Sequence, residues 1–268
     1  MTPSCLCYNE AMHIPPAIQP VLATVTSTLP TQLGDTLVGI YLYGSAVWGD
    51  FDDDISDIDV LVVLTRDVDD TLFAQLDAWH QALEARYADW AGRIEIAYIS
   101  TQALQTFKTQ RSPIAVISPG EPFNIKDAGI DWLINWYTIR HQSMVLMGPA
   151  PDSIIPVISD AEFRENVRRQ VGEWRDWVGH AQDSRPYQAY IILTMCRALY
   201  AYTTGTQASK AQAAAWAMRE LPEYAPIIAN ALIWRRDHRE MDINHAATYR
   251  FAVEMVRVVG EKIGIVWD

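Results

Sequence analysis

The feature that most constrains this chain is a pair of aspartates at the head of an apolar run, Asp57-Ile58-Asp59 followed by residues 60–64. Side chains of a β-strand alternate between its faces, so carboxylates at positions i and i+2 point the same way. Unpaired charge is costly at the edge of an apolar core, and two carboxylates there suit a hard divalent cation. The pattern therefore predicts a buried strand whose first residues bind metal.

A second apolar segment, residues 37–43, precedes this strand and ends at Gly44-Ser45. Because glycine has no side chain, backbone amides and the Ser45 hydroxyl can approach a phosphate group there. A phosphate-binding turn beside metal-binding carboxylates predicts nucleotidyl transfer.

The competing interpretation is a solvated acidic turn. We accept it for residues 52–54, since three consecutive carboxylates repel one another unless they are exposed. For Asp57 and Asp59 we favour the metal site, because their apolar neighbours place them beside the core.

A transferase of this kind needs a third carboxylate, and the candidate is Glu95. It lies in residues 93–99, where alternating apolar residues after Gly92 indicate a short strand. A Glu inside a strand can point across the sheet toward Asp57 and Asp59. On the local pattern alone, an edge-strand Glu that faces water fits equally well.

The charge of the chain is concentrated in its first part. Residues 1–157 contain seven Lys and Arg against nineteen Asp and Glu, whereas residues 158–268 contain fourteen of each. A net charge of −12 in the first part repels nucleic acid and attracts cationic small molecules. We therefore expect a small-molecule partner and no nucleic acid.

No run of the 268 residues approaches the ~20 apolar residues that cross a bilayer, and residues 1–16 lack the features of a secretory signal. Cys5, Cys7 and Cys196 form no disulfide framework. We expect a cytoplasmic protein, without a membrane partner, that acts as a monomer.

Periodicity divides the chain into two parts of different character. In the first part, strands alternate with helices. We expect one helix after residues 15–16 that ends near residue 29, a second over residues 69–90 and a third over residues 131–143. A short apolar stretch at 144–147 follows. After residue 159 every periodic segment indicates a helix, over residues 160–181, 187–203, 209–219, 222–236 and 244–263.

Two cations in the helical part require a partner. Arg197 lies within an otherwise apolar helix, and Lys210 lies at a helix start, where the helix dipole disfavours positive charge. A triphosphate would satisfy both. The alternative for Arg197 is an ion pair with Glu173 or Asp176.

These motifs resemble known families. Gly44-Ser45 followed by Ser56-Asp57-Ile58-Asp59 resembles the signature of nucleotidyltransferases of the DNA polymerase β type. Residues 193–222 look like the helical domain of the streptomycin/spectinomycin adenylyltransferases. Residues 93–95 and 146–149 are similar to further elements of that family, so the likeness covers most of residues 36–222.

The resemblance implies an α/β nucleotidyltransferase domain with a mixed sheet and flanking helices, residues 1–157, and an all-α helical-bundle domain, residues 158–268. It implies that Asp57, Asp59 and Glu95 bind two Mg²⁺ ions and that Glu95 is also the catalytic base. The residues that it places on ATP are Gly44, Ser45, Ser56, Arg197 and Lys210.

The chain departs from that family where the substrate would bind. The family has an acidic Gly-Asp-Glu-Arg segment where this chain has residues 184–188, and Gly-Glu-Trp is replaced by residues 120–123. The candidate substrate contacts are Trp132, Trp136, Asp183 and Tyr187. Aromatic residues at helical spacing are more often part of a core.

We therefore expect Mg²⁺-dependent transfer of AMP from ATP to a hydroxyl of a cationic small molecule. The resemblance implies that this molecule is an aminoglycoside or aminocyclitol antibiotic and that the activity confers resistance. The alternatives are an adenylyltransferase that acts on a protein or another metabolite, and a non-catalytic nucleotide-binding relative.

Overall fold

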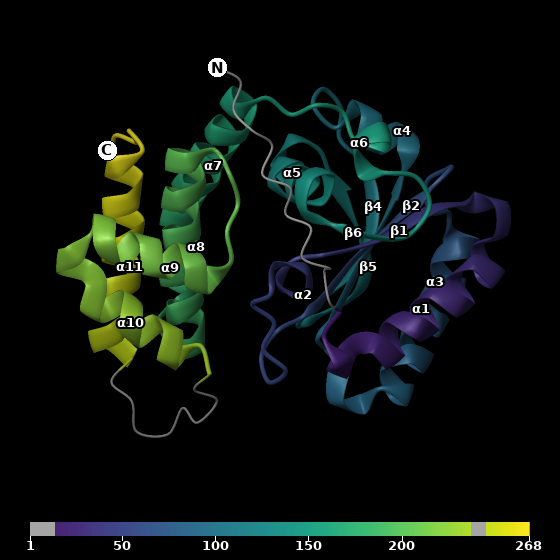
Figure 1. Cartoon of the computed structure of the whole chain (residues 1–268), viewed down its shortest axis with the longest axis horizontal. Helices are drawn as coiled ribbons and strands as arrows, with labels where there is room; N and C mark the ends of the chain where they lie inside the picture. Colours follow the sequence, from purple (N-terminus) through teal and green to yellow (C-terminus); the bar gives the residue numbers. More distant parts are fainter. Residues whose placement is uncertain (1–13, 237–244, 268) are drawn as a thin grey trace, which may run out of the picture.

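The computed structural model describes residues 14–236 and 245–267, which form a sheet-containing domain and a helical domain side by side (Figure 1). The elements of the first domain are α1 (Gln19–Leu33), β1 (Leu37–Tyr43), α2 (Ser45–Trp48), β2 (Ile58–Leu64), α3 (Asp70–Arg86), β3 (Ile94–Ser100), α4 (Thr101–Thr106), β4 (Ser112–Ser118), β5 (Glu121–Ala128), α5 (Leu133–Gln142), β6 (Met144–Met147) and α6 (Pro151–Ile154). The helices of the second domain are α7 (Asp160–Trp177), α8 (Arg185–Thr204), α9 (Lys210–Glu220), α10 (Ala225–Trp234) and α11 (His245–Lys262).

The six strands form one mixed sheet in the order β5-β4-β3-β2-β1-β6. Strands β2 and β3 are parallel, and every other neighbouring pair is antiparallel. This sheet, with its flanking helices and the helical second domain, confirms the predicted fold class.

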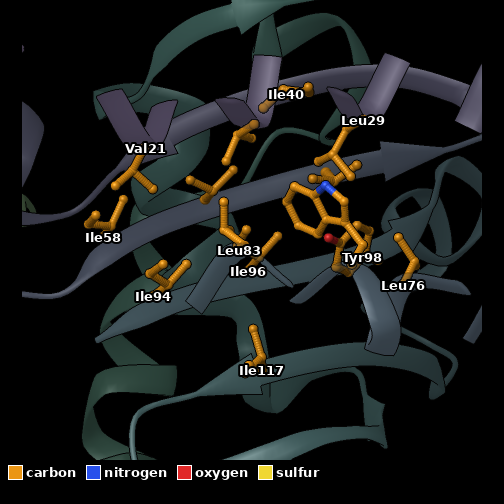
Figure 2. Close-up of a cluster of buried hydrophobic side chains, with 14 of the residues drawn as sticks. Val21, Leu29, Ile40, Ile58, Leu76, Leu83, Ile94, Ile96, Tyr98 and Ile117 are labelled. Atoms are coloured by element: carbon orange, nitrogen blue, oxygen red, sulfur yellow. The ribbon is translucent and has the colours of Figure 1, made fainter. Parts of the chain in front are cut away.

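Strand β2 is buried on both faces, which explains its unbroken apolar sequence. Ile58, Val60, Val62 and Leu64 pack under α1 and α3 in a core that Figure 2 shows from the side, with Val21 and Leu29 of α1 above the strands. The side chains of opposite parity, such as Leu61, pack in a second core against α4 and α5. Residue 59 shares the parity of Leu61, so its side chain is on this second face.

The helical domain is built around α8, which contacts the other four helices of that domain. Its own buried residues, among them Ile191, Leu193 and Met195, pack in a core separate from those of the sheet. Ala201 of α8 instead packs in the second core of the sheet domain, beside α5 and α7. Helix α8 therefore joins the two domains. The predicted boundary between residues 157 and 158 falls between α6 and α7.

Several boundaries differ from the sequence prediction. Helix α1 continues to Leu33, beyond the expected end near residue 29, and it contains Pro30. The α-helix expected over 69–90 ends at Arg86 and is followed by a short 3-10 turn. Helix α4 and the β4–β5 hairpin were not predicted. No helix in the described part of the chain is long and apolar enough to span a membrane.

Candidate active site

Three side chains form a row across adjacent strands. In the antiparallel β1–β2 pair Tyr43 lies opposite Asp59, and in the parallel β2–β3 pair Asp59 lies opposite Glu95. The Tyr43 hydroxyl donates a hydrogen bond to Glu95 Oε1 over 3.5 Å. The alternation of strand side chains puts all three on the face of the sheet that carries α5. The edge-strand interpretation of Glu95 is wrong, because β3 lies between β2 and β4.

Gly44 follows β1 with φ 74° and ψ −151°, a conformation that is nearly restricted to glycine. A Cβ atom built at this position would lie 2.0 Å from Asp59 Oδ2. The chain therefore turns directly over the carboxylate, and Ser45 begins the short helix α2 immediately beyond. The glycine is required both by the backbone conformation and by the close approach of Asp59.

We expect Gly44→Ala to destabilise the protein by about 3 kcal/mol or more, because backbone strain adds to the contact with Asp59. Gly49→Ala is a matched control: Gly49 also has positive φ, in the left-handed helical region, but a Cβ there would meet no atom within 4 Å. The control should cost about 1 to 2 kcal/mol. Urea unfolding of both variants measures the difference, and equal losses would contradict the close-approach argument.

Ser56 organises the loop that leads to the aspartates. Its hydroxyl accepts a hydrogen bond from the Asp52 N–H at 2.9 Å, and its carbonyl accepts hydrogen bonds from the Arg93 guanidinium. The Arg93 guanidinium also lies 4.5 Å from the Trp90 ring centre. This anchored loop fixes Asp57 at the entrance of β2. The Ser56 hydroxyl therefore has a structural partner within the protein.

A cavity of about 270 Å³ lies where the two domains meet, and it brings the predicted residues together. Asp57, Asp59 and Glu95 line one side. Three cations, one each from α8, the start of α9 and the end of α10, line the other side; they are Arg197, Lys210 and Arg235. Gly44, Ser45 and Ser56 also line this cavity.

Burial raises the pKa values of the three carboxylates, and neighbouring like charges raise two of them further. Burial, followed by the neighbouring charges of Glu95 and Asp57, raises the pKa of Asp59 well above its usual range. Burial and the Asp57 charge raise the pKa of Glu95 to about 7. Burial also raises the pKa of Asp57, although Lys210 and Arg93 oppose that shift. The positive charges near these three carboxylates are therefore not sufficient to offset the cost of their burial and mutual repulsion.

The pKa values of Lys210 and Arg197, which line the cavity, are lowered, because burial disfavours their charged forms as well. Burial, together with the charges of Arg197 and Arg235, lowers the pKa of Lys210 to about 8. Burial likewise lowers the pKa of Arg197. Within the described residues, Arg197 Nε and Trp48 Nε1 are buried donors without a hydrogen-bond partner, and both residues line the cavity. An anionic ligand would supply the missing acceptors.

The alternative ion pairs for Arg197 do not form. Glu173 pairs with Arg169 at 3.9 Å, and Asp176 pairs with Arg175 at 3.4 Å. The Arg197 guanidinium instead lies 5.2 Å from the centre of the Trp48 ring.

The donor set fits a hard divalent cation, since Asp57, Asp59 and Glu95 present only carboxylate oxygens. Over residues 14–236 and 245–267, no three acidic, His or Cys side chains form a ready-made metal site. Mutual repulsion of the carboxylates agrees with a site that is completed by water and phosphate oxygens.

The four candidate substrate residues lie outside this cavity. Trp136 is 0% exposed and packs in the core beneath α5, with Trp132 stacked on it at 5.5 Å. The interpretation of Trp136 as a substrate contact is therefore wrong, because a substrate cannot reach it in this structure. Tyr187 stacks on Tyr190, which does line the cavity. Asp183 precedes α8 and is exposed.

Several further residues line the cavity and were not predicted, among them Tyr43, Trp48, Asp50, Tyr190 and Arg235. Tyr43 could have been found, since it immediately precedes Gly44-Ser45 on the predicted strand. Asp50 Oδ2 accepts a hydrogen bond from the Ala211 N–H of α9 at 3.3 Å, a contact between distant segments. Arg235 reaches the cavity only through the packing of α10. No local pattern identifies these last two.

The fold and the two-sided cavity are those of a nucleotidyltransferase, and a family model described as nucleotidyltransferase domain matches residues 29–110. A second family model, described as aminoglycoside adenylyltransferase, C-terminal domain, matches residues 153–258. The chain belongs to the aminoglycoside adenylyltransferase family.

Similar proteins agree with this assignment. An aminoglycoside (3'') (9) adenylyltransferase of Klebsiella pneumoniae is 29% identical over 227 residues, covering 78% of this chain and 82% of the relative. One of Rhizobium radiobacter is 27% identical over 263 residues, covering 90% and 93%. The crystal structure of a spectinomycin adenyltransferase from Enterococcus faecialis, with ATP and spectinomycin, superposes with a TM-score of 0.69 at 19% identity, covering 89% of this chain and 98% of that one.

Proposed function

We propose that this enzyme transfers AMP from ATP to a hydroxyl group of an aminoglycoside or aminocyclitol antibiotic, and that this modification confers resistance. The observation that supports the proposal most is the single cavity in which Asp57, Asp59 and Glu95 face Arg197 and Lys210. The names of the relatives support the acceptor class. The acidic first domain would attract such cationic molecules.

In the proposed mechanism Arg197 and Lys210 bind the ATP phosphates, with the backbone at Gly44-Ser45 close to them. Two Mg²⁺ ions, held by Asp57, Asp59 and Glu95, would supply positive charge beside the reacting phosphate.

Glu95 accepts the proton of the acceptor hydroxyl, whose oxygen forms a bond to the α-phosphorus. The bond from that phosphorus to the oxygen bridging to the β-phosphate breaks, and pyrophosphate leaves. Burial and the Asp57 charge raise the pKa of Glu95, which makes its carboxylate a stronger base toward the acceptor hydroxyl.

A protein acceptor and another small metabolite are the remaining candidates. The second, helical domain counts against a protein acceptor, because the small protein-modifying members of the superfamily are often single short domains. A non-catalytic role is disfavoured, since all three carboxylates are present in one cavity.

The test is a pyrophosphate-release screen of the purified protein with ATP or GTP and a panel of aminocyclitols and aminoglycosides. We expect release with ATP that depends on both Mg²⁺ and one or more acceptors. Release that depends on none of the antibiotics, or that requires a protein acceptor, would contradict the proposed substrate class.

The phosphate-binding role of the two cations gives a separate prediction. Arg197→Ala and Lys210→Ala should each raise the KM for ATP by about tenfold or more, since a charge-assisted hydrogen bond contributes about 1.5–3 kcal/mol. Arg219→Ala on the same helix as Lys210 is the control, because Arg219 donates a hydrogen bond to the Ala215 carbonyl and does not line the cavity. An unchanged KM with a lowered melting temperature would show that the two cations have a structural role instead.

A further inference from the structure

Trp48 is the last residue of α2, directly after the Gly44-Ser45 turn, and it lines the first cavity. Its backbone N–H donates a hydrogen bond to the Gly44 carbonyl at 3.3 Å. Gly49, with φ 72°, ends the helix, and Asp50 accepts a hydrogen bond from the start of α9. The backbone is therefore anchored on both sides of Trp48, and the fold sets the position of its ring in the cavity wall.

The Trp48 ring faces a cation of the other domain. The Arg197 guanidinium carbon lies 5.2 Å from the centre of the ring. A cation within about 6 Å of a ring centre is attracted to the face of the ring, and tryptophan gives the strongest attraction of this kind. Since Trp48 belongs to α2 and Arg197 to α8, the contact joins the two walls of the cavity.

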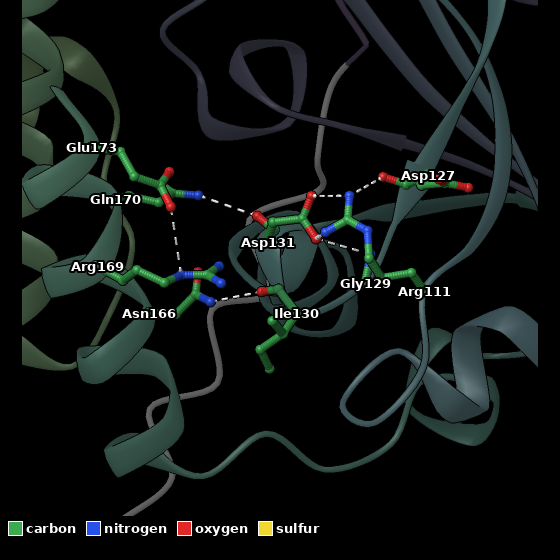
Figure 3. Close-up of polar contacts among 9 residues, drawn as sticks. All are labelled: Arg111, Asp127, Gly129, Ile130, Asp131, Asn166, Arg169, Gln170 and Glu173. Carbon is green, nitrogen blue, oxygen red and sulfur yellow. Dashed lines mark hydrogen bonds and ion pairs between the residues drawn. The ribbon is translucent and has the colours of Figure 1, made fainter. Parts of the chain in front are cut away.

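Polar contacts outside the cavity hold the two domains in the arrangement that brings this pair together. Figure 3 shows Asn166 of α7 donating a hydrogen bond to the Ile130 carbonyl at 2.7 Å, and Gln170 donating one to the Asp131 carbonyl at 3.4 Å. None of these four residues lines the first cavity. Helix α7 packs against α8, so the same contacts help to fix the helix that carries Arg197.

A ring holds Arg197 in a different way from a carboxylate. The five N–H donors of a guanidinium lie in its plane, whereas an aromatic ring contacts its face. A carboxylate would occupy some of those donors and offset the charge. Arg197 Nε has no hydrogen-bond partner among the described residues, and Glu173 and Asp176 are paired elsewhere on α7. Arg197 is thus held in place while its charge and donors stay available to an anionic ligand.

Lys210 has a comparable contact, since its ammonium lies 5.0 Å from the centre of the Tyr190 ring. Tyr190, however, also lines a second cavity of about 190 Å³ between α5, α7 and α8. Trp48 does not line that second cavity. A substitution of Trp48 therefore changes the wall of the first cavity alone, and this makes it the better residue for a test.

We propose that Trp48 is a positioning residue for the nucleotide: its ring holds the Arg197 guanidinium in the cavity and leaves its N–H groups for the phosphates. This inference rests on the proposed function, in which Arg197 binds the ATP phosphates. A long arginine side chain loses conformational freedom when it binds a ligand, and that loss opposes binding. The ring restricts the side chain beforehand, so less freedom is lost when ATP binds.

The first test measures the affinity for ATP and for inorganic tripolyphosphate by calorimetry in the presence of Mg²⁺. Trp48→Leu should weaken both about tenfold, and Trp48→Phe, which keeps an aromatic face, about threefold. Unchanged affinities overturn the inference. Equal losses in the two variants would show that the indole N–H matters rather than the ring, and weaker binding of ATP alone would show that the ring contacts the base; either result also overturns it.

Two further proteins keep the test decisive if Trp48→Leu does not fold. Replacement of Trp48 by tetrafluorotryptophan keeps the shape and the N–H but withdraws electrons from the ring, so tripolyphosphate should bind several-fold more weakly. Unchanged binding overturns the inference. Trp177→Leu is the matched control, because Trp177 is 57% exposed at the end of α7 and lines neither cavity. Its affinities should equal those of the unmodified protein.

A double substitution shows whether Trp48 acts through Arg197. In the Arg197→Ala background, Trp48→Leu should weaken tripolyphosphate binding no further, because the cation that the ring holds is already absent. A second tenfold loss in that background overturns the inference. Failure of the unmodified protein to bind either ligand contradicts both the proposed function and this inference. Binding of ATP without reaction of any antibiotic contradicts only the proposed function.

Discussion

Asp59→Asn is expected to reduce adenylyl transfer by about 10³-fold or more while leaving the fold intact. The substitution removes a charged ligand from the proposed metal site, whose electrostatic effect on the reacting phosphate is worth several kcal/mol. The melting temperature without metal should not fall, because the pKa of Asp59 is raised by burial and by Glu95. A group whose ionisation is disfavoured in the folded state does not stabilise that state at neutral pH.

Asp57→Asn should have an effect of the same kind. Asp53→Asn is the matched control, because Asp53 is exposed in the loop before β2 and lines no part of the first cavity. Steady-state kinetics and calorimetric titration with ATP, each with and without Mg²⁺, measure the effects. Mg²⁺-dependent activity that survives in either the Asp57 or the Asp59 variant would show that these aspartates do not form the metal site.

Glu95→Gln is expected to lower kcat by about 10²–10⁴-fold, the usual contribution of a general base. Glutamine keeps the shape of the side chain and an oxygen that can face metal, but it cannot accept the proton of the acceptor hydroxyl. ATP should therefore bind nearly as well as to the unmodified enzyme.

The pH dependence gives this prediction a second measurement. Because the base must be ionised, activity of the unmodified enzyme should rise as pH increases through the pKa of Glu95, which burial and Asp57 raise in the structure. The residual activity of Glu95→Gln should lack that rise. Turnover within a few-fold of the unmodified enzyme on a confirmed acceptor would place the base elsewhere.

Much of the fold could be predicted because the central strands are long apolar runs with clear ends. Strand β1 ends at Tyr43, just before Gly44, and β2 begins after Asp57, and both boundaries follow from local chemistry. The β4–β5 hairpin is less apparent, since Pro113 and Pro122 lie within its strands and β5 carries exposed polar residues. Those strands form because β4 pairs with β3, a contact that no local pattern contains.

The candidate site could be predicted where residues close in sequence have the same chemical role, as Asp57 and Asp59 do as proposed metal ligands. Arg197 and Lys210 were suggested by their unfavourable helical positions, and the structure places both across the cavity from those carboxylates. The substrate residues were harder, because an aromatic residue on a helix has the same pattern whether it faces a core or a cavity. Trp136 faces the core, whereas Tyr190 lines both cavities.

The mass of the acceptor after reaction shows whether the proposed adenylyl transfer occurs. The purified enzyme is incubated with ATP, Mg²⁺ and an aminocyclitol, and the product is analysed by mass spectrometry together with the pyrophosphate released. We expect one AMP group on one acceptor hydroxyl for each pyrophosphate released, and almost none with Glu95→Gln. Pyrophosphate released with free AMP and an unmodified acceptor would contradict it.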